Sequence, residues 1–471
     1  MSINSINKIS LLSILLFVFA ASCKKADLSP IPQTNLSDAV AFATPDRMAQ
    51  QVNGLYAAMK NGNFLGGRGI VYNDVRGENW LNVTGNGVTA LGVWNYSVVS
   101  SDNQVENTWS TGYAAINRAN VVLKGIADNA TVVPAALGNN YRGEARFCRA
   151  VNYFYLTTLY GKRPYTADGG ASLGIPLRLT ASTGSGGEAL ARATQAQVFT
   201  QILDDLTFAE NNLPLKYLSG DSNVVRAHKN AAIAFKTRVY LHMANYPAVI
   251  LEANKIVSNT APFVSATGVI HSLSANFTNV FRAPYTLSES IFSLPMNNTN
   301  SPGTQNGLSS YHNSEFGLNP AGILADPGWN ALDNRKTLVT ASQRYQKYND
   351  DVNNWVAIIR YSEVLLNLAE ALARQGAAVD ARALAILNAV RQRSDAATTF
   401  NPATKTDLIN QILNERNIEL LGEGHRSIDL QRLGLAFPAK GTLSQVLPTA
   451  QNYVWPLPAS ELLYNSLAVQ N

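Results

Sequence analysis

Apolar residues recur at helical spacing along much of the chain, and the helices that they predict come in neighbouring pairs. The most regular segment, RYSEVLLNLAEALARQG at 360–376, places Tyr361, Val364, Leu365, Leu368 and Leu372 on one stripe. Further helices are predicted at about 44–60, 107–127, 139–160, 195–213, 228–258 with a turn at Pro247, from 381 and from 407. The pairing predicts tetratricopeptide-like packing, although no strict repeat period is visible.

Long stretches without a helical pattern separate these pairs. They lie at about 62–101, 163–194, 261–356 and 436–471, are rich in Gly, Asn and Thr, and hold most of the Trp residues. Segments of this length within a compact protein are usually functional or have structure of their own. We therefore expect a single body over residues 41–471, in which a helical scaffold supports loop-rich insertions.

The N-terminus has the pattern of an export signal. Residues 1–22 carry Lys8 and then the apolar run 11–21, which is shorter than the roughly 20 residues that span a bilayer. The small pair Ala21-Ser22 directly before Cys23 is typical of a lipobox, and an ordinary signal peptide with an incidental cysteine is the alternative. Residues 23–40 are polar and broken by proline, so they predict a flexible tether between a lipid on Cys23 and the folded body.

Charge is sparse. The chain has 471 residues with 37 Lys and Arg against 32 Asp and Glu, a net charge of +5, and charged residues make up 15%, compared with about 25% in an average soluble domain. Without a dense basic cluster, this balance argues against nucleic acid as a partner. Asn, Gln, Ser, Thr and Tyr replace the charges, which favours uncharged hydrogen bonding. If Cys23 is lipidated, Cys148 is left unpaired in a packed helix.

Patterns for catalysis and for metal binding are missing. The five histidines show no HExxH or HxH spacing, and the glycine-rich segments lack phosphate-loop spacing. A glycosidase needs two carboxylates about 5 to 10 Å apart; the candidates are Asp204-Asp205, Asp350-Asp351 and the series Glu415, Glu419 and Glu423. Ion pairing with Arg416 and Arg426 is the simpler interpretation of that series. The segment 348–354 offers oxygen ligands for calcium but lacks EF-hand spacing, so a solvated turn is favoured and no cofactor is predicted.

Five segments carry a family pattern. In chain order they are WSTGYAAINRANVVLKGI (109–126), ARFCRAVNYFYLTTLYGKRPY (145–165), IIRYSEVLLNLAEALARQG (358–376), ILNERNIELLGEGHRSIDLQRLG (412–434) and VWPLPASELLYNSLAVQN (454–471). Together with Cys23, their number, order and spacing resemble the SusD/RagB family of nutrient-binding outer-membrane lipoproteins. The resemblance covers nearly the whole chain.

The resemblance implies a fold, a function and a partner. The fold would be mainly α, with about four tetratricopeptide-like helix pairs forming a scaffold for a loop-rich half. The protein would be a non-enzymatic lipoprotein on the outer membrane, facing the extracellular side, that captures oligosaccharides for a SusC-like TonB-dependent transporter. A peptide-binding, RagB-like member is the alternative, and a surface glycoside hydrolase is a weaker one.

Charged residues of the family motifs are expected to be structural. Their alternating signs along two helical segments suit a buried ion-pair network that fixes the helix register. The residues are Arg360, Glu363, Glu370, Arg416, Glu419, Glu423, Arg426 and Asp429.

The loops are the expected ligand site, because a sugar ring offers a C–H face to an aromatic plane and hydroxyl groups to amides. The segments 72–97 and 296–335 would form two walls, and about half of the rings in the first are expected to be buried. Trp109 and Trp455 are expected to be packed. The candidate ligand-binding residues are Tyr72, Asn73, Asp74, Trp80, Trp94, Tyr96, Tyr311, Trp329, Asp333 and Arg335, with Arg76, Asn79, Asn82 and His312 beside them.

Overall fold

The computed structural model describes residues 40–182, 184 and 189–471. The predicted signal peptide, Cys23 and nearly all of the predicted tether lie outside the described residues. Within them the protein is mainly α-helical, as the helical periodicity predicts. No helix in the described ranges is both long and apolar enough to cross a bilayer.

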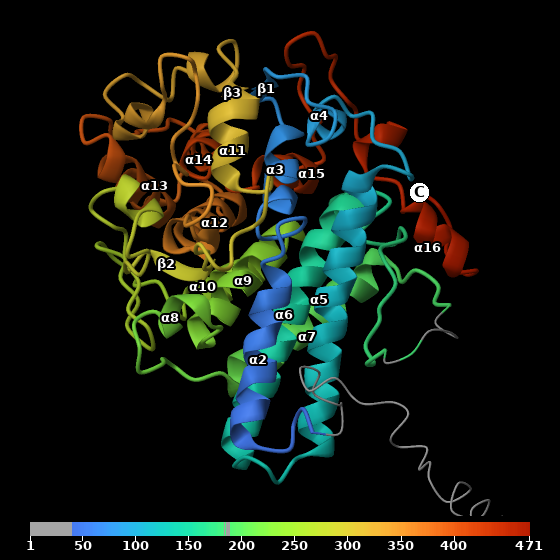
Figure 1. Cartoon of the computed structure of the whole chain (residues 1–471). Helices are drawn as coiled ribbons and strands as arrows, with labels where there is room; N and C mark the ends of the chain where they lie inside the picture. Colours follow the sequence, from blue (N-terminus) through green and yellow to red (C-terminus); the bar gives the residue numbers. More distant parts are fainter. Residues whose placement is uncertain (1–39, 183, 185–188) are drawn as a thin grey trace, which may run out of the picture.

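The long helices pack in series along the chain (Figure 1). α2 lies against α5, α5 against α6, α6 against α7, α7 against α9 and α9 against α10. The series continues through α10, α12, α13 and α14, so the expected helix pairs form one continuous scaffold. The bounds are α2 Pro45–Met59, α5 Asn103–Asp128, α6 Ala135–Tyr160, α7 Gln195–Asn212, α9 Lys229–His242, α10 Tyr246–Ala253, α12 Tyr361–Gln375, α13 Ala381–Ser394, α14 Lys405–Glu419 and α15 Arg426–Arg432.

Local sequence signals place the helix starts. Thr44 accepts a hydrogen bond from the Arg47 amide at 3.3 Å, and Pro45 occupies the first turn of α2. Thr194 before α7 and Thr404 before α14 each form a capping box with the side chain three residues later. These caps satisfy amides that have no partner within the helix, which explains why the predicted and observed boundaries agree closely.

Short elements occupy the stretches between the helices. Two antiparallel pairs are formed there, β1 (Trp80–Asn82) with β3 (Phe316–Leu318) and β2 (Ser290–Leu294) with β4 (Val356–Arg360). The short α-helices are α3 Arg68–Val75, α4 Leu91–Trp94, α8 Ser222–Val225, α11 Leu308–Ser310 and α16 Ala459–Tyr464. Single turns of 3-10 or π type cover Tyr165–Ala167, Thr278–Phe281, Tyr311–Glu315, Ile323–Ala325, Asn334–Leu338 and Gln451–Tyr453.

The stretch 62–101 has no helical pattern in its sequence, yet it contains α3 and α4. Every residue of α3 after Arg68 is buried, so the helix is covered on all sides. A helix without a solvent face has no polar stripe, and its sequence therefore shows no amphipathic period.

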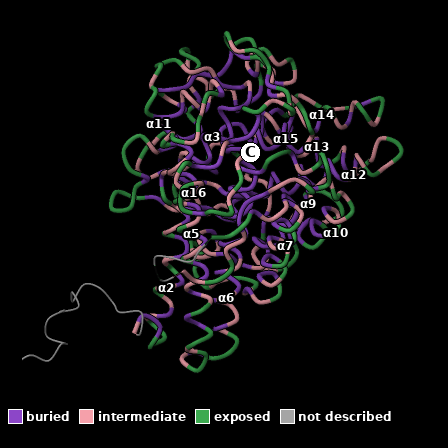
Figure 2. The backbone as a smooth tube through the Cα atoms, turned by 90° about the vertical axis from the view of Figure 1, so that its right-hand side faces the viewer, coloured by how far each residue is buried: buried purple, intermediate pink, exposed green. Residues whose placement is uncertain are grey.

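One hydrophobic core extends through the helical scaffold and the loop-rich stretches. Figure 2 shows buried residues running through the middle of the molecule. α6 lies at its centre and buries every residue from Ala150 to Tyr160. Cys148 is buried and free within α6, as predicted. A Cβ on Gly112 of α5 would lie 2.8 Å from a methyl of Leu156, so glycine is required where α5 crosses α6.

Candidate functional site

The two segments expected to form the ligand site do meet, but their aromatic rings face inward. β1 of the first segment pairs with β3 of the second, with Trp80 opposite Leu318. Trp80 then stacks on His312, the ring centres lying 4.5 Å apart. An irregular region without a helix or sheet core of its own needs large side chains to fill its interior. These rings supply that packing.

Burial corrects the expected role of the candidate residues. All of them except Trp94 are buried, so they do not present a surface to a ligand: Tyr72, Asn73, Asp74, Trp80, Tyr96, Tyr311, Trp329, Asp333 and Arg335. Trp94 is half-buried, and its indole N–H donates to the Trp80 carbonyl at 2.8 Å. The expectation that about half of the first segment's rings would be exposed is therefore wrong. Trp109 and Trp455 are buried, as expected.

Two of these candidates, Asp333 and Arg335, belong to a buried ion-pair network. Arg335 is fully buried and lies 2.6 Å from Asp333, 2.7 Å from Glu415 and 2.7 Å from Glu419. Arg335 therefore links its 3-10 turn to α14. Because the partners are about 80 residues apart in sequence, local spacing did not reveal this role.

The motif charges expected to be structural lie in the same interior, except Arg426, which is half-buried. Arg360 lies 2.6 Å from Glu289, 2.6 Å from Glu419 and 2.8 Å from Glu423. The further contacts are Glu363 with Arg238, Glu370 with Arg374 and Arg432, Arg416 with Asp429, Asp429 with Arg432, and Arg426 with Glu78. The partners of Glu415, Glu419 and Glu423 are Arg335, Arg360, Lys347, Arg391 and Arg393, rather than the adjacent Arg416 and Arg426 expected from sequence.

The network makes stability depend on acid pH. Burial by itself raises the pKa of Glu363, but the Arg238 guanidinium at 2.6 Å outweighs it and lowers that pKa to about 2. The pKa values of Glu370, Glu419 and Glu423 are also lowered, because nearby guanidinium groups overcome the effect of burial. A carboxylate with a depressed folded pKa contributes stability above its unfolded pKa, and that contribution is lost as pH falls through the folded pKa.

We expect the free energy of unfolding to fall steeply between about pH 4.5 and pH 2. Each pKa unit corresponds to about 1.4 kcal/mol, so Glu363 alone contributes roughly 3 kcal/mol that acid removes. Urea titrations at pH 6, 4 and 3 measure this fall. The Glu363→Gln variant should be less stable at pH 6 and should show a shallower pH dependence. Parallel curves for the two proteins would contradict the role of Glu363.

An open polar cavity of about 270 Å³ lies where the two predicted walls meet α14 and α15. We call it the amide cavity. Its polar lining combines amides, carboxylates and one guanidinium, while leucine and isoleucine side chains supply apolar surface. The lining residues are Glu78, Asn79, Gly322, Ile323, Asp326, Leu413, Asn414, Asn417, Arg426, Asp429, Leu433 and Leu435.

Hydrogen bonds hold the amides of this cavity in place. The Asn79 side-chain N–H donates to Asn417 Oδ1 at 2.7 Å, and Asn414 Nδ2 donates to Asp326 Oδ1 at 2.9 Å. Asp326 also accepts from the Gly328 amide at 2.7 Å. Asn414 and Asn417 stand three residues apart on α14, so their side chains share one helix face. Fixed amides and a fixed carboxylate present donors and acceptors in a set geometry.

Two glycines allow this arrangement. A Cβ on Gly77 would lie 2.4 Å from Arg426 Cγ, and a Cβ on Gly328 would lie 2.3 Å from Asn414 Nδ2. Only glycine lets the backbone pass this close, so that Arg426 can pair with Glu78 and Asn414 can reach Asp326.

Most of this cavity is not predicted from the sequence. Asn79 is predicted beside the site, whereas Arg426 and Asp429 are predicted to be structural only. The α14 amides stand within the segment ILNERNIELLGEG, where their polar character on a half-exposed helix face is ordinary. An amide pair three residues apart was the available signal, but its significance depends on Asp326 and Asn79, which are distant in sequence.

Most of the carboxylates considered for catalysis or for calcium have other partners. Asp205 pairs with Arg149 at 2.7 Å, and the glutamates of α14 belong to the network. Asp350 accepts hydrogen bonds from the amides of Val352 and Asn353 at 2.8 and 2.9 Å. These bonds close a turn, which agrees with the turn predicted for residues 348–354. Among the described residues, no group of three or more His, Cys, Asp and Glu is placed to hold a metal ion.

A helical scaffold with an open cavity lined by amides, carboxylates, a guanidinium group and apolar side chains is an arrangement suited to ligand binding. Comparison with known sequences shows which family the chain resembles. Residues 29–241 match the family described as "Starch-binding associating with outer membrane", and residues 293–471 match the SusD family. SusD-like protein P2 of Formosa agariphila is 26% identical over 98% of both chains.

Solved structures agree with these matches. A SusD superfamily protein from Bacteroides fragilis is 33% identical, with a TM-score of 0.83 over 91% of this chain and 99% of that one. A laminarin-binding SusD-like protein shares the fold at 20% identity, with a TM-score of 0.69 over 91% and 99% of the two chains. The chain belongs to the SusD/RagB family. Proteins of this family are carbohydrate-binding rather than catalytic, and they associate with the outer membrane.

Proposed function

We propose that this protein is a cell-surface lipoprotein that holds an oligosaccharide in the amide cavity and delivers it to a SusC-like TonB-dependent transporter. The observation that carries the proposal is the cavity itself, in which fixed Asn, Asp and Arg groups surround apolar leucine surface. Sugar hydroxyl groups pair with such donors and acceptors, and the C–H faces of a pyranose ring pack on apolar side chains. The family's outer-membrane association and the laminarin-binding neighbour support the same function.

The membrane attachment in this proposal rests on the sequence. Cys23 follows an apolar run and a small pair, and the family match begins six positions later, at residue 29. A diacylated Cys23 would hold the body, residues 41–471, at the membrane by the polar tether, on the extracellular side where the ligand arrives. The general association of the family with SusC-like transporters supports the proposed partner.

A binding screen tests the function. The migration of the purified protein should be slowed in native gels that contain a neutral β-glucan or starch. Isothermal titration should then show binding of an oligosaccharide derived from the polysaccharide that slows it. No reducing sugar should be released during incubation with that polysaccharide. A peptide array run in parallel tests the RagB-like alternative: binding to peptides without any response to glycans would overturn the proposal.

A further inference from the structure

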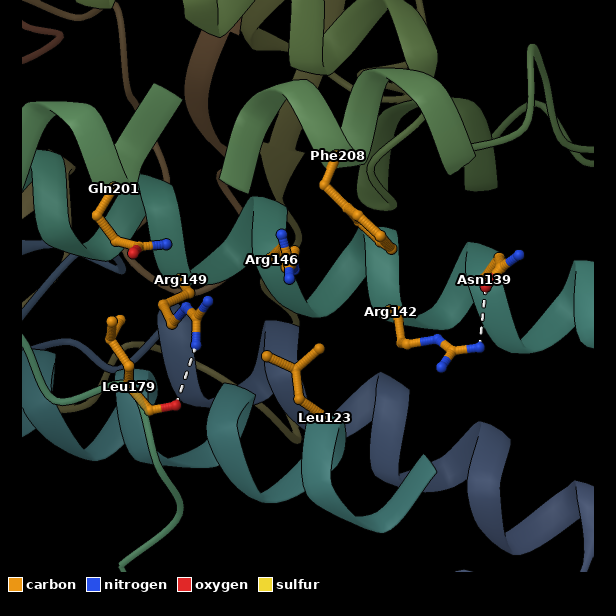
Figure 3. Close-up of a pocket in the computed structure, with 8 residues that line it drawn as sticks. All are labelled: Leu123, Asn139, Arg142, Arg146, Arg149, Leu179, Gln201 and Phe208. Atoms are coloured by element: carbon orange, nitrogen blue, oxygen red, sulfur yellow. Dashed lines mark hydrogen bonds between the residues drawn. The ribbon is translucent and has the colours of Figure 1, made fainter. Parts of the chain in front are cut away.

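A basic groove runs along one face of α6, between α5 and α7 (Figure 3). Arg142, Arg146 and Arg149 stand at positions i, i+4 and i+7, so their side chains project from the same helix face. Leu123 of α5 and Phe208 of α7 form the sides. We call this the arginine groove. Its volume is about 560 Å³, within the range of about 300 to 1,000 Å³ typical of ligand pockets.

Asp205 is the one carboxylate in the described residues that pairs with the groove's guanidinium groups, and two of them share it. Arg149 is buried and binds Asp205 through two hydrogen bonds of 2.8 and 2.7 Å. Arg146 lies 3.8 Å from the same carboxylate, which Arg149 already occupies. Its guanidinium group is held instead over the Phe208 ring, 4.2 Å from the ring centre. Arg146 therefore contributes positive charge at a fixed position.

Arg142 contributes a second positively charged guanidinium group to the groove. It donates one hydrogen bond, to Asn139 Oδ1 at 2.9 Å, and its Nε is buried without a hydrogen-bond partner. Among the described residues that line the groove, none is acidic. The Arg142 guanidinium is therefore only partly hydrogen-bonded within the protein, so it can still donate to an acceptor in the groove.

The spacing of the two groups indicates the ligand. Four residues along an α-helix correspond to about 6 Å, so Arg142 and Arg146 suit two anionic groups on one extended molecule. A guanidinium fork matches the oxygen pairs of a carboxylate or a sulfate. Leu123 and Phe208 add apolar contact between them, as the C–H faces of sugar rings require.

We propose that the arginine groove is a second binding site, which takes oligosaccharides carrying carboxylate or sulfate groups on neighbouring sugar units. This inference rests on the proposed carbohydrate function for the class of ligand, but it uses none of the residues of the amide cavity. An acidic protein segment carries carboxylates too and is the competing occupant that the experiment separates.

The test compares two double variants with the same loss of charge. Arg142→Gln/Arg146→Gln removes the two guanidinium groups that do not bind Asp205 closely and keeps most of each side chain. Arg118→Gln/Lys124→Gln removes two exposed charges from α5 and is the control. The probes for isothermal titration are oligogalacturonate, a sulfated carrageenan oligosaccharide, a neutral laminarin oligosaccharide and poly-glutamate.

We expect at least one acidic oligosaccharide to bind the wild-type protein, and its affinity to fall about tenfold or more in the groove variant but not in the control. Affinity for a neutral ligand should not change.

Equal weakening in both variants, tighter binding of poly-glutamate, or no binding of either acidic oligosaccharide would overturn the inference. If a neutral glycan binds while the acidic ones do not, the inference fails and the proposed function stands; if no glycan binds, both fail. Equal melting temperatures of the variants exclude unfolding as the cause.

Discussion

The Arg360→Ala variant is expected to lose about 3 to 5 kcal/mol in free energy of unfolding. Arg360 is almost fully buried, and its guanidinium group contacts Glu289, Glu419 and Glu423 at 2.6 to 2.8 Å. Removing it leaves carboxylates in the interior with fewer cations to balance them, and a stranded buried charge costs about that much. Glu289 lies directly before β2, whereas Glu419 and Glu423 lie at and just after the end of α14, so the loss would loosen the contact of β4 with both of these segments.

Urea denaturation of purified protein measures the effect, with Lys124→Ala as the matched surface control. Lys124 pairs with Asp128, and the two side chains are 60% and 55% exposed, so its removal should change stability by less than about 1 kcal/mol. Arg360→Lys keeps the positive charge, but the lysine ammonium group cannot contact three carboxylates as the guanidinium group does. We therefore expect an intermediate loss in the free energy of unfolding. Equal stability of Arg360→Ala and the wild-type protein would show that the network does not hold the fold.

The second large effect is expected on binding. The Asn414→Ala/Asn417→Ala variant should bind the oligosaccharide found in the screen about tenfold to a hundredfold more weakly. Each lost hydrogen bond contributes about 0.5 to 1.5 kcal/mol, and removing Asn417 also frees the Asn79 amide that it now orients. The two side chains are half-buried on one face of α14 and line the amide cavity. Titration calorimetry gives the change in dissociation constant.

Asn410→Ala provides the control, because Asn410 is exposed on the same helix and does not line the cavity. Its affinity should equal that of the wild-type protein. Single Asn414→Ala and Asn417→Ala variants show whether the two amides act separately. A folded double variant with wild-type affinity would place the glycan elsewhere on the molecule and would refute the amide cavity as its site.

Much of the scaffold could be predicted from local patterns. The predicted helix at 195–213 corresponds to α7, Gln195–Asn212, and the one at 139–160 to α6, Ala135–Tyr160. Amphipathic spacing and capping residues act within a few residues of each other, so they are visible in a linear sequence. α3 escaped prediction because it is buried on every side and therefore has no such spacing.

The site was much less predictable. Composition indicated which segments hold aromatic and amide side chains, and the pairing of β1 with β3 does bring those segments together. It did not indicate which way the rings face. Trp80 points toward His312 because the register of that strand pair turns it inward, and register depends on contacts between segments more than 230 residues apart in sequence.

The sequence by itself determined the long helices, the family and the set of motif charges that hold the helices together. Only the tertiary structure decided the partners of those charges, the burial of the expected binding residues and the position of the amide cavity. The physical reason is the range of the interactions. Helix periodicity and capping are local, whereas Arg335 meets Glu415, and Asn79 meets Asn417, only after distant segments have packed.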